Sequence, residues 1–310
     1  MTKFIIRRLL SLIPTMFIIV TLSFFLMHLA PGGPFSREKK LPEQVLQNIL
    51  KKYHMDEPLY KQYLRYLGDV VLRGDLGPSF RYKDSSVNEL IGQTMPVTVT
   101  LGLVALALAT SLGISAGIIS ALKQNKWQDY GAMSLAVIGI SVPLFVIGPV
   151  LQLIFAMKLH WLPTSGWITG RAGLRALIMP AVTLSFPFFA YIARLSRGSI
   201  LEVLRSDYIR TARAKGLSEA VVVRKHVLKG ALIPVVSYLG PAFAGIVVGS
   251  LVVESVFVVP GVGRIFVQSA LNRDYTLIMG DVIVYSLILV MMNFLVDIVY
   301  SMLDPRIAYK

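Results

Sequence analysis

Hydrophobic residues along this chain of 310 residues gather in six long stretches, and polar segments separate them. A helix of about 20 apolar residues, rising 1.5 Å per residue, crosses the roughly 30 Å hydrocarbon core of a bilayer. The pattern therefore predicts an all-α polytopic membrane protein with about six transmembrane helices. The expected spans are residues 9–30, 97–121, 131–157, 177–193, 231–253 and 277–300.

The first stretch, 9–30, follows the basic residues Lys3, Arg7 and Arg8. Positive charge before an apolar run is typical both of a cleaved signal peptide and of a retained signal anchor. This run is longer than the usual apolar core of a signal peptide, about 7–15 residues, and further spans follow it. We therefore expect a retained anchor.

Residues 31–95 differ in kind, because they hold ten Lys or Arg, eight Asp or Glu and no long apolar run. Pro42–Tyr53 and Pro58–Leu72 have the pattern of short helices, each with a proline in its first turn. Gly74–Pro78 predicts a turn, and Ser86–Glu89 is a capping box that predicts the start of another short helix. This region is expected to form a small folded cap outside the bilayer.

The two short helices of the cap have distinct faces. Tyr63, Leu67 and Val70 fall on one face at helical spacing. Aromatic residues are enriched at protein interfaces, so exposed tyrosines would suit a cap that meets a neighbouring protein. The tyrosines expected to be exposed are Tyr53, Tyr60 and Tyr66.

The formal net charge of +14 is spread unevenly between the polar segments. Short segments on the side of the N-terminus hold 16 Lys or Arg, whereas short segments on the other side hold 5. Long segments such as 31–95 carry little orienting weight, so the positive-inside rule places both termini in the cytoplasm. A one-sided excess indicates membrane topology rather than a nucleic-acid partner.

Composition agrees with a membrane protein, with 55% hydrophobic residues, 15% charged residues and a mean hydropathy of +0.66. Soluble domains carry about 25% charged residues. The chain has no cysteine, so it can form neither a disulfide nor a thiolate metal site, and its four histidines lack ligand spacing. No glycine precedes a lysine, which excludes a P-loop. We expect no catalytic residue, metal or cofactor in this chain.

The segment 194–230 contains nine Lys or Arg, too many to insert into a bilayer. Apolar residues such as Ile200, Leu204 and Val222 alternate with these charges, as in short amphipathic helices. Two interpretations remain open on composition alone. The segment is either a loop that only fixes topology or a docking surface for a cytoplasmic protein.

Within this segment lies the run Asp207-Tyr208-Ile209-Arg210-Thr211-Ala212-Arg213-Ala214-Lys215-Gly216-Leu217. It resembles the cytoplasmic EAA loop of ABC importer permeases, in the form that the peptide permeases use. The general family pattern is Glu-Ala-Ala, three residues, Gly, nine residues, then Ile-x-Leu-Pro. Here Arg210-Thr211-Ala212 replaces the first triplet and Gly216 matches the glycine, but His226, Leu228 and Lys229 stand where Ile, Leu and Pro are expected.

The resemblance covers nearly the whole chain. Gly77-Pro78-Ser79-Phe80 and the short loop between the third and fourth spans favour the oligopeptide permease B subunits over their dipeptide relatives. The other runs similar to this family are Phe4-Ile5-Ile6-Arg7-Arg8, Leu29-Ala30-Pro31-Gly32, Gly74-Asp75-Leu76-Gly77, Pro260-Gly261-Val262-Gly263, Asn272-Arg273-Asp274-Tyr275, Val296-Asp297 and Asp304-Pro305-Arg306.

This resemblance implies a type I ABC importer permease fold in a bacterial inner membrane. It implies a non-catalytic permease subunit that forms half of a conduit for oligopeptides, with ATP and Mg²⁺ bound by partner subunits.

The implied partners are a second permease (OppC-like), two cytoplasmic ATPases (OppD- and OppF-like), an extracytoplasmic peptide-binding protein (OppA-like), membrane lipid and the peptide. The residues Asp207 to Leu217 would couple the permease to an ATPase. A helix there, with small side chains at Thr211, Ala212 and Ala214, would enter a groove of the ATPase, and Gly216 would let the chain turn sharply after it. The implied domains are 1–30, an N-terminus and first helix; 31–93, an extracytoplasmic cap; 94–303, a five-helix transmembrane domain that includes the loop 194–230; and 304–310, a cytoplasmic tail.

Alternative functions are an importer of dipeptides, murein peptides, glutathione or nickel, or an ion-driven secondary transporter. A secondary transporter predicts internal repeats and mid-membrane charges, and no convincing repeat is visible. A membrane enzyme predicts a cluster of acids, bases or metal ligands, and none is visible either.

Several other residues inside the spans are candidates for packing or for function. The glycine pairs Gly113/Gly117 and Gly245/Gly249 are spaced for close helix packing, with conduit lining as the alternative. Prolines should kink or break helices at Pro143, Pro149, Pro180 and Pro187. The polar groups in or beside spans are Glu254, Asp281, Asn293 and Asp297.

Overall fold

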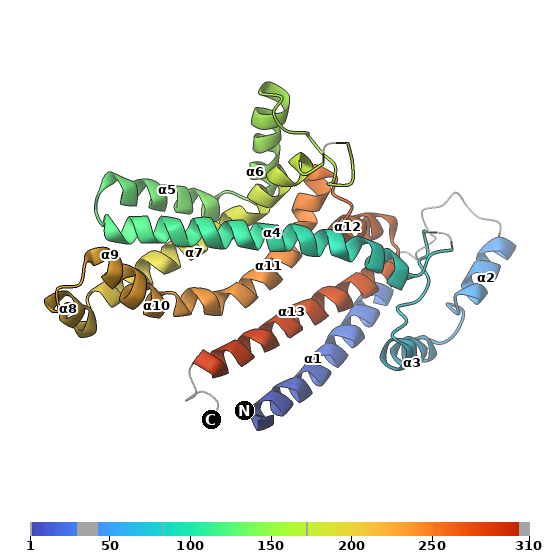
Figure 1. Ribbon diagram of the computed structural model, residues 1–310. Coiled ribbons are helices and arrows are strands. Elements are labelled where there is room, and N and C mark those ends of the chain that lie inside the picture. Colours follow the sequence, from blue (N-terminus) through green and yellow to red (C-terminus); the bar gives the residue numbers. More distant parts are fainter. Residues whose placement is uncertain (1, 30–42, 83, 172, 304–310) are drawn as a thin grey trace. The chain divides into compact units, whose positions relative to one another are not determined.

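The computed structural model describes residues 2–29, 43–82, 84–171 and 173–303, and within these ranges the regular elements are all helices (Figure 1). The chain divides into two compact units. Among the described residues, the large unit contains Thr98–Pro260 and residues 291–303, and the small unit contains the described parts of Thr2–Val97 and Gly261–Val290. The expected tail 304–310, with Asp304-Pro305-Arg306, lies outside the described residues, as do Ala30–Gly32 and Pro42.

Five single helices are long and apolar enough to cross a membrane, and a bent pair makes a sixth candidate span. The six apolar stretches of the sequence therefore correspond to six candidate spans. The five single helices are α1 (Thr2–Leu29), α4 (Val87–Leu122), α7 (Arg175–Leu204), α11 (Ile233–Phe257) and α13 (Tyr275–Leu303).

The sixth candidate span is broken at Pro143, as the sequence predicts. The helix α5 (Trp127–Ser141) ends just before Val142, which is extended at φ −94° and ψ 123°. The helix α6 (Leu144–Leu151) then continues as the π-helical turn η2 (Gln152–Lys158), and the two arms of the span differ in direction by 112°. Proline disfavours helical geometry in the residue before it, which explains a break at this position.

The prolines of the fourth span, Pro180 and Pro187, lie inside a continuous helix, so of the two expected outcomes, a kink or a break, the break does not occur. The helix α7 runs without interruption from Arg175 to Leu204 and so extends beyond the expected end at residue 193. Charged residues from Arg194 onward mark where a chain leaves the hydrocarbon, but they do not oppose helix formation. The first eleven residues of segment 194–230 are therefore helical.

Glycines bring the helices of the large unit close together. A Cβ atom on Gly113 would lie 2.8 Å from Ile192 Cγ2, and one on Gly117 would lie 2.4 Å from Ser196 Cβ. The helix α4 therefore packs against α7 at distances that larger residues cannot match, which confirms the packing interpretation of this pair. Gly245 of α11 similarly faces the ring of Phe188, with Phe188 Cε1 at 3.1 Å from its ideal Cβ.

Short helices of the small unit match the expected cap elements in part. They are α2 (Glu43–Lys52), α3 (Leu59–Gly68) with the π-helical turn η1 (Asp69–Arg73), and α12 (Val262–Asn272). The expected face of α3 and η1 is confirmed, because the Tyr63 hydroxyl lies 2.8 Å from that of Thr21 on α1, and Leu67 and Val70 join the buried cluster. Tyr66 joins the same cluster with its Oη buried, so its expected exposure is wrong. Tyr60 is exposed and Tyr53 packs its ring against Phe80.

The capping box at Ser86 is confirmed by its two reciprocal bonds. The Glu89 amide donates to Ser86 Oγ at 3.2 Å, and the Ser86 amide donates to Glu89 Oε2 at 3.1 Å. The helix that begins here is not short, however, because α4 continues for 36 residues. A capping box fixes where a helix begins, while the apolar run behind it sets the length.

The predicted turn at Gly74–Pro78 is present and depends on two glycines in left-handed conformations. Gly74 has φ 63° and Gly77 has φ 90°. The side chain of Asn88 bridges the turn, since its Oδ1 accepts from the Leu76 amide at 2.8 Å and its Nδ2 donates to the Gly74 carbonyl at 2.7 Å. The cap turn is thereby fixed to the first turn of α4.

Candidate functional site

The candidate site predicted by the sequence is a short helix, α8 (Asp207–Ala214), in the segment between α7 and α11. Figure 1 shows α8 and the next short helices gathered at the end of α7. Ser206 precedes α8 in an extended conformation, and Lys215 ends it. Gly216 follows with φ +77°, and its amide donates to the Arg213 carbonyl at 2.9 Å. The sharp exit expected at this glycine is therefore present, and it needs a residue without a Cβ atom.

One face of α8 is buried within the chain's own structure. Ile209 is fully buried and Ala212 is 6% exposed. They pack in a cluster with residues of α4, α7 and the segment after Gly216, which we call the coupling-loop core. Its buried members are Ala121, Ile200, Ile209, Ala212, Val222, Val227 and Ala231. The expectation that Ala212 enters a groove of a partner is therefore wrong, because its methyl group fills a space in this chain.

The other face of α8 is polar and exposed. Tyr208 is half exposed, and Thr211 and Ala214 offer small side chains beside it. This face could enter a partner's groove without loss of the helix's own packing. The exposed residues of the predicted run are Asp207, Tyr208, Arg210, Thr211, Arg213, Ala214, Lys215, Gly216 and Leu217.

An ion pair connects the two ends of the Gly216 turn. Arg213 Nη2 donates to Glu219 Oε1 at 2.6 Å, and its Nε donates to Oε2 at 3.1 Å. The hydrogen bonds from Arg213 lower the pKa of the Glu219 carboxyl below its usual value of 4.5. Both side chains are largely exposed, so the pair orients α9 (Glu219–Val221) relative to α8 without adding much stability.

The second half of the family pattern lies on a continuous helical stretch. The helix α9 passes into the π-helical turn η3 (Val222–Val227) and α10 (Leu228–Ala231). Leu228 packs on the coupling-loop core, whereas Lys229 is exposed and His226 is half buried. Leu228 therefore matches the leucine of the family pattern and packs inside the chain, whereas the isoleucine and proline positions hold His226 and Lys229.

Sequence reasoning missed a buried polar cluster around Asp129, which we call the Asp129 clamp and which consists of Asp129, Arg197, Ser120 and Asn125. Asp129 Oδ1 accepts from Arg197 Nε at 2.7 Å, and Oδ2 accepts from Arg197 Nη2 at 2.8 Å. Ser120 Oγ also donates to Oδ1, and the Asn125 amide donates to Oδ2 at 2.9 Å. In the sequence, Arg197 was counted only among the basic residues of segment 194–230, and Asp129 was given no role. Arg194 and Arg197 are three residues apart in the same segment, and the sequence alone does not show which of them pairs with Asp129.

The polar groups expected in or beside the spans lie in different surroundings. Glu254 is fully buried on α11, and its Oε1 accepts from the Thr98 hydroxyl at 2.7 Å. Asp281 is fully buried on α13, Asn293 is exposed, and the side chain of Asp297 lies outside the described residues. The described residues contain no group of three His, Asp or Glu that could hold a metal ion.

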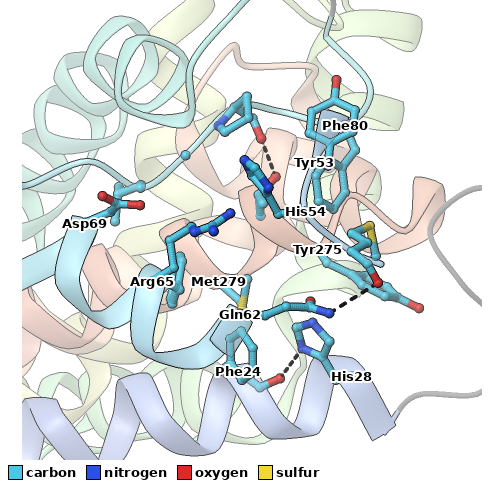
Figure 2. Close-up of a pocket in the computed structure, with 16 residues that line it drawn as sticks. Phe24, His28, Tyr53, His54, Gln62, Arg65, Asp69, Phe80, Tyr275 and Met279 are labelled. Atoms are coloured by element: carbon cyan, nitrogen blue, oxygen red, sulfur yellow. Dashed lines mark hydrogen bonds between the residues drawn. The ribbon is translucent and has the colours of Figure 1, made fainter. Parts of the chain in front are cut away.

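A cavity of about 200 Å³ lies in the small unit, between α1, α3, the 76–80 loop and α13 (Figure 2). Three of its polar side chains, those of His28, Gln62 and Arg65, are engaged by neighbours. His28 Nδ1 bonds the Phe24 carbonyl at 2.8 Å, Gln62 Nε2 donates to the Glu57 carbonyl at 2.7 Å, and Arg65 Nη2 donates to Glu57 Oε1 at 2.9 Å. The rest of the lining combines aromatic rings, such as those of Phe24 and Phe80, with apolar side chains such as Leu76 and Met279.

A buried carboxylate also organises the small unit at the predicted Asn272–Tyr275 run. Ser79 Oγ donates to Asp274 Oδ2 at 2.5 Å, and the Phe80 amide donates to Oδ1 at 3.2 Å. The Arg81 guanidinium donates from Nε to the Asn272 carbonyl at 2.9 Å. The two runs that the sequence marks, near residues 77–80 and 272–275, therefore form one structural joint.

These helices, with a broken third span and a short amphipathic helix between the fourth and fifth, define the class as a membrane permease of the ABC importer fold. An amino acid ABC transporter crystallised with histidines matches 68% of this chain and 92% of its own, with TM-score 0.54 and 18% identity. The methionine ABC transporter MetNI, in an inward-facing conformation, matches 70% of this chain and 97% of its own, with TM-score 0.56 and 20% identity. At such identities the likeness shows the fold.

The chain belongs to the family of binding-protein-dependent transport system inner membrane components, whose model matches residues 113–309. A model of the N-terminal part of such components matches residues 1–102. The oligopeptide transport system permease protein OppB of Haemophilus influenzae is 52% identical over the full length of both chains, and that of Escherichia coli K12 is 50% identical. The dipeptide transport system permease protein DppB of Bacillus subtilis is 43% identical over 99% of this chain and 98% of its own.

Family membership confirms the resemblance predicted from Asp207–Leu217 and the runs around it. The chain is a multi-pass inner membrane protein and a transport permease of the OppB-like type. The role of the residues Asp207–Leu217 remains a prediction, since family membership does not assign them.

Proposed function

We propose that this chain is one of two permease subunits of an ATP-driven importer of oligopeptides. The observation that carries the substrate class is the full-length identity of 52% and 50% to two OppB proteins, against 43% to a DppB protein. The chain supplies half of the conduit, and a second, OppC-like permease supplies the other half. The importer of dipeptides, murein peptides, glutathione or nickel is the alternative within the same class.

ATP hydrolysis in this proposal belongs to partners. Two ATPases, OppD- and OppF-like, bind ATP and Mg²⁺, and an OppA-like binding protein delivers the peptide from outside. The chain has no Gly-Lys dipeptide for a P-loop, which agrees with this division of labour. An ion-driven transporter would act without an ATPase, and this is the property that separates the two mechanisms.

The proposed topology places both termini and α8 in the cytoplasm, with the cap 31–93 outside. The charge distribution supports it, since short segments on one side hold 16 Lys or Arg and those on the other hold 5. A reporter enzyme that is active only outside the cytoplasm should work when fused at Lys83 and fail when fused at Lys215. The opposite pattern would overturn the orientation.

Coupling in this proposal uses the two faces of α8 differently. The buried face, with Ile209 and Ala212, fixes α8 to α4 and α7 through the coupling-loop core. The exposed face, with Tyr208, Thr211 and Ala214, enters a groove of an ATPase. Because α8 is fixed on one side, closure of the ATPase pair would move α4 and α7 as rigid bodies and switch the access of the conduit.

The function is tested with the whole complex in proteoliposomes. Uptake of labelled peptides of two to six residues should require ATP, both ATPases and the binding protein, and should favour peptides longer than two. Uptake by the chain alone under an ion gradient would replace this proposal with the secondary transporter. A preference for dipeptides would keep the importer and change its substrate class.

A further inference from the structure

The Asp129 clamp lies at one end of three helices of the large unit. Ser120 is in the last turn of α4, Asp129 is in the first turn of α5, and Arg197 is near the end of α7. The side chain of Asp129 is 4% exposed and that of Arg197 is 27% exposed. A buried carboxylate with four hydrogen bonds holds its partners in one geometry, because losing any bond leaves buried charge unpaired.

The clamp and the coupling-loop core occupy consecutive positions on the same helices. Ser120 of the clamp precedes Ala121 of the core on α4. Arg197 lies one helical turn before Ile200, which also belongs to the core. Any force that α8 exerts on the core through Ile209 therefore reaches α4 and α7 next to the clamp.

The clamp provides a type of contact that the rest of the interface between α5 and α7 lacks. Along that interface, Gly139 of α5 faces the Cβ of Ala190, which would be 2.9 Å from an added Cβ. Such packing is close but non-directional. Among the described residues, the hydrogen bonds that join α5 to α7 are those between Asp129 and Arg197. They fix the register of α5 on α7 through two parallel bonds.

We propose that Asp129, Arg197 and Ser120 are positioning residues that transmit the displacement of α8 to α5 as well as to α4 and α7. With the clamp intact, the four elements move together when an ATPase moves α8. Without it, α8 still displaces α7, but the α5 arm of the broken span lags behind. This inference rests on the proposed function, because it requires an ATPase that acts on α8.

The test measures coupling in the reconstituted complex, as peptide transported per ATP hydrolysed. The variants are Arg197→Lys, which retains the charge and loses the paired geometry, Asp129→Asn, and the milder Ser120→Ala. We expect the ATPases to copurify and to hydrolyse ATP, while transport per ATP falls at least about fivefold in Arg197→Lys and Asp129→Asn. Ser120→Ala should show a smaller fall in the same direction.

The control is Arg175→Gln, which removes an exposed arginine at the other end of α7. It should leave transport per ATP unchanged. The exchanged pair Asp129→Arg with Arg197→Asp should recover part of the ratio lost in Asp129→Asn. If transport and hydrolysis fell in equal proportion in all three variants, the ratio of peptide transported to ATP hydrolysed would be unchanged. That result would overturn the proposed role of the Asp129 clamp. Absence of peptide-stimulated hydrolysis in the unmodified complex would instead overturn the proposed function.

Discussion

Two ion pairs in the large unit have the same chemistry and different surroundings. Asp129 with Arg197, and Glu219 with Arg213, each join a carboxylate to a guanidinium by two hydrogen bonds. The carboxylate of the first pair is 4% exposed and that of the second is 57% exposed. Water therefore replaces the lost bonds of the second pair when it breaks, and it cannot do so for the first.

The two pairs also connect different lengths of chain. Arg197 and Asp129 are 68 residues apart, so their bonds hold separate helices together. Arg213 and Glu219 are six residues apart and only orient α8 relative to α9 across one turn. Bond geometry alone does not rank these two interactions, because burial and chain separation decide how much each contributes to stability.

The largest effect is expected from removing one partner of the buried pair. Asp129→Ala leaves Arg197 partly buried without its carboxylate, and should lower the free energy of unfolding by about 3 kcal/mol, since Arg197 retains some access to water. Thermal unfolding in detergent, followed by circular dichroism, measures the change. A loss no greater than that of the exposed pair would mean that burial does not distinguish the two.

The two faces of α8 offer a second test. The expected loss in the free energy of unfolding is similar to that of Asp129→Ala or smaller. Ala212→Glu places a carboxylate in the coupling-loop core and should reduce stability by about 2–3 kcal/mol. Ala214→Glu changes the exposed face by the same chemistry and should leave the unfolding temperature unchanged, while weakening copurification with the ATPases. If both variants copurified normally, α8 would not be the docking element.

Gly216→Val should have an intermediate effect, because a β-branched residue is strained at φ +77°. The expected loss is about 1–2 kcal/mol, although no atom lies within 4 Å of an added Cβ. Gly198→Val, at a helical glycine of α7 that also has open space, is the matched control for added bulk. Equal losses in the two variants would point to the added bulk rather than to the left-handed turn.

The smallest effect is expected from the exposed pair. Glu219→Gln should change the free energy of unfolding by less than about 1 kcal/mol. Arg213 lowers the pKa of Glu219 in the folded protein, so the stability from this pair is present above the unfolded pKa and is lost as pH falls through the folded value. The difference in unfolding temperature between the parent and Glu219→Gln should therefore shrink from pH 7 towards pH 4. A difference that grew on acidification would contradict this assignment.

Much of the fold follows from local patterns. Six apolar stretches predicted six candidate spans, Pro143 predicted the break in the third, and Ser86 with Glu89 predicted a helix start. Gly113 with Gly117 predicted a face of α4 that packs closely against another helix, although not which helix. Each of these features depends on residues within a few positions of one another, which is why the sequence is enough.

Features that depend on distant residues were missed or misjudged. Tyr66 was expected at the surface but packs with Phe24 of α1, at 5.9 Å between ring centroids. The segment from residue 194 was expected to form separate short helices, yet its first residues continue α7 as far as Leu204. Helical periodicity shows that a face exists, and it cannot show what covers that face.

In the candidate site, too, some features depend on neighbouring residues and others on residues far apart in the chain. The amino-acid sequence by itself determined the apolar spans, the short amphipathic run from Asp207 to Leu217 and the turn at Gly216, because hydropathy, periodicity and backbone freedom are local properties. Only the tertiary structure decided that Ala212 faces the chain's own core and that Arg197 is the arginine paired with Asp129. Both outcomes depend on which helices meet, and residues far apart in the chain bring those helices together.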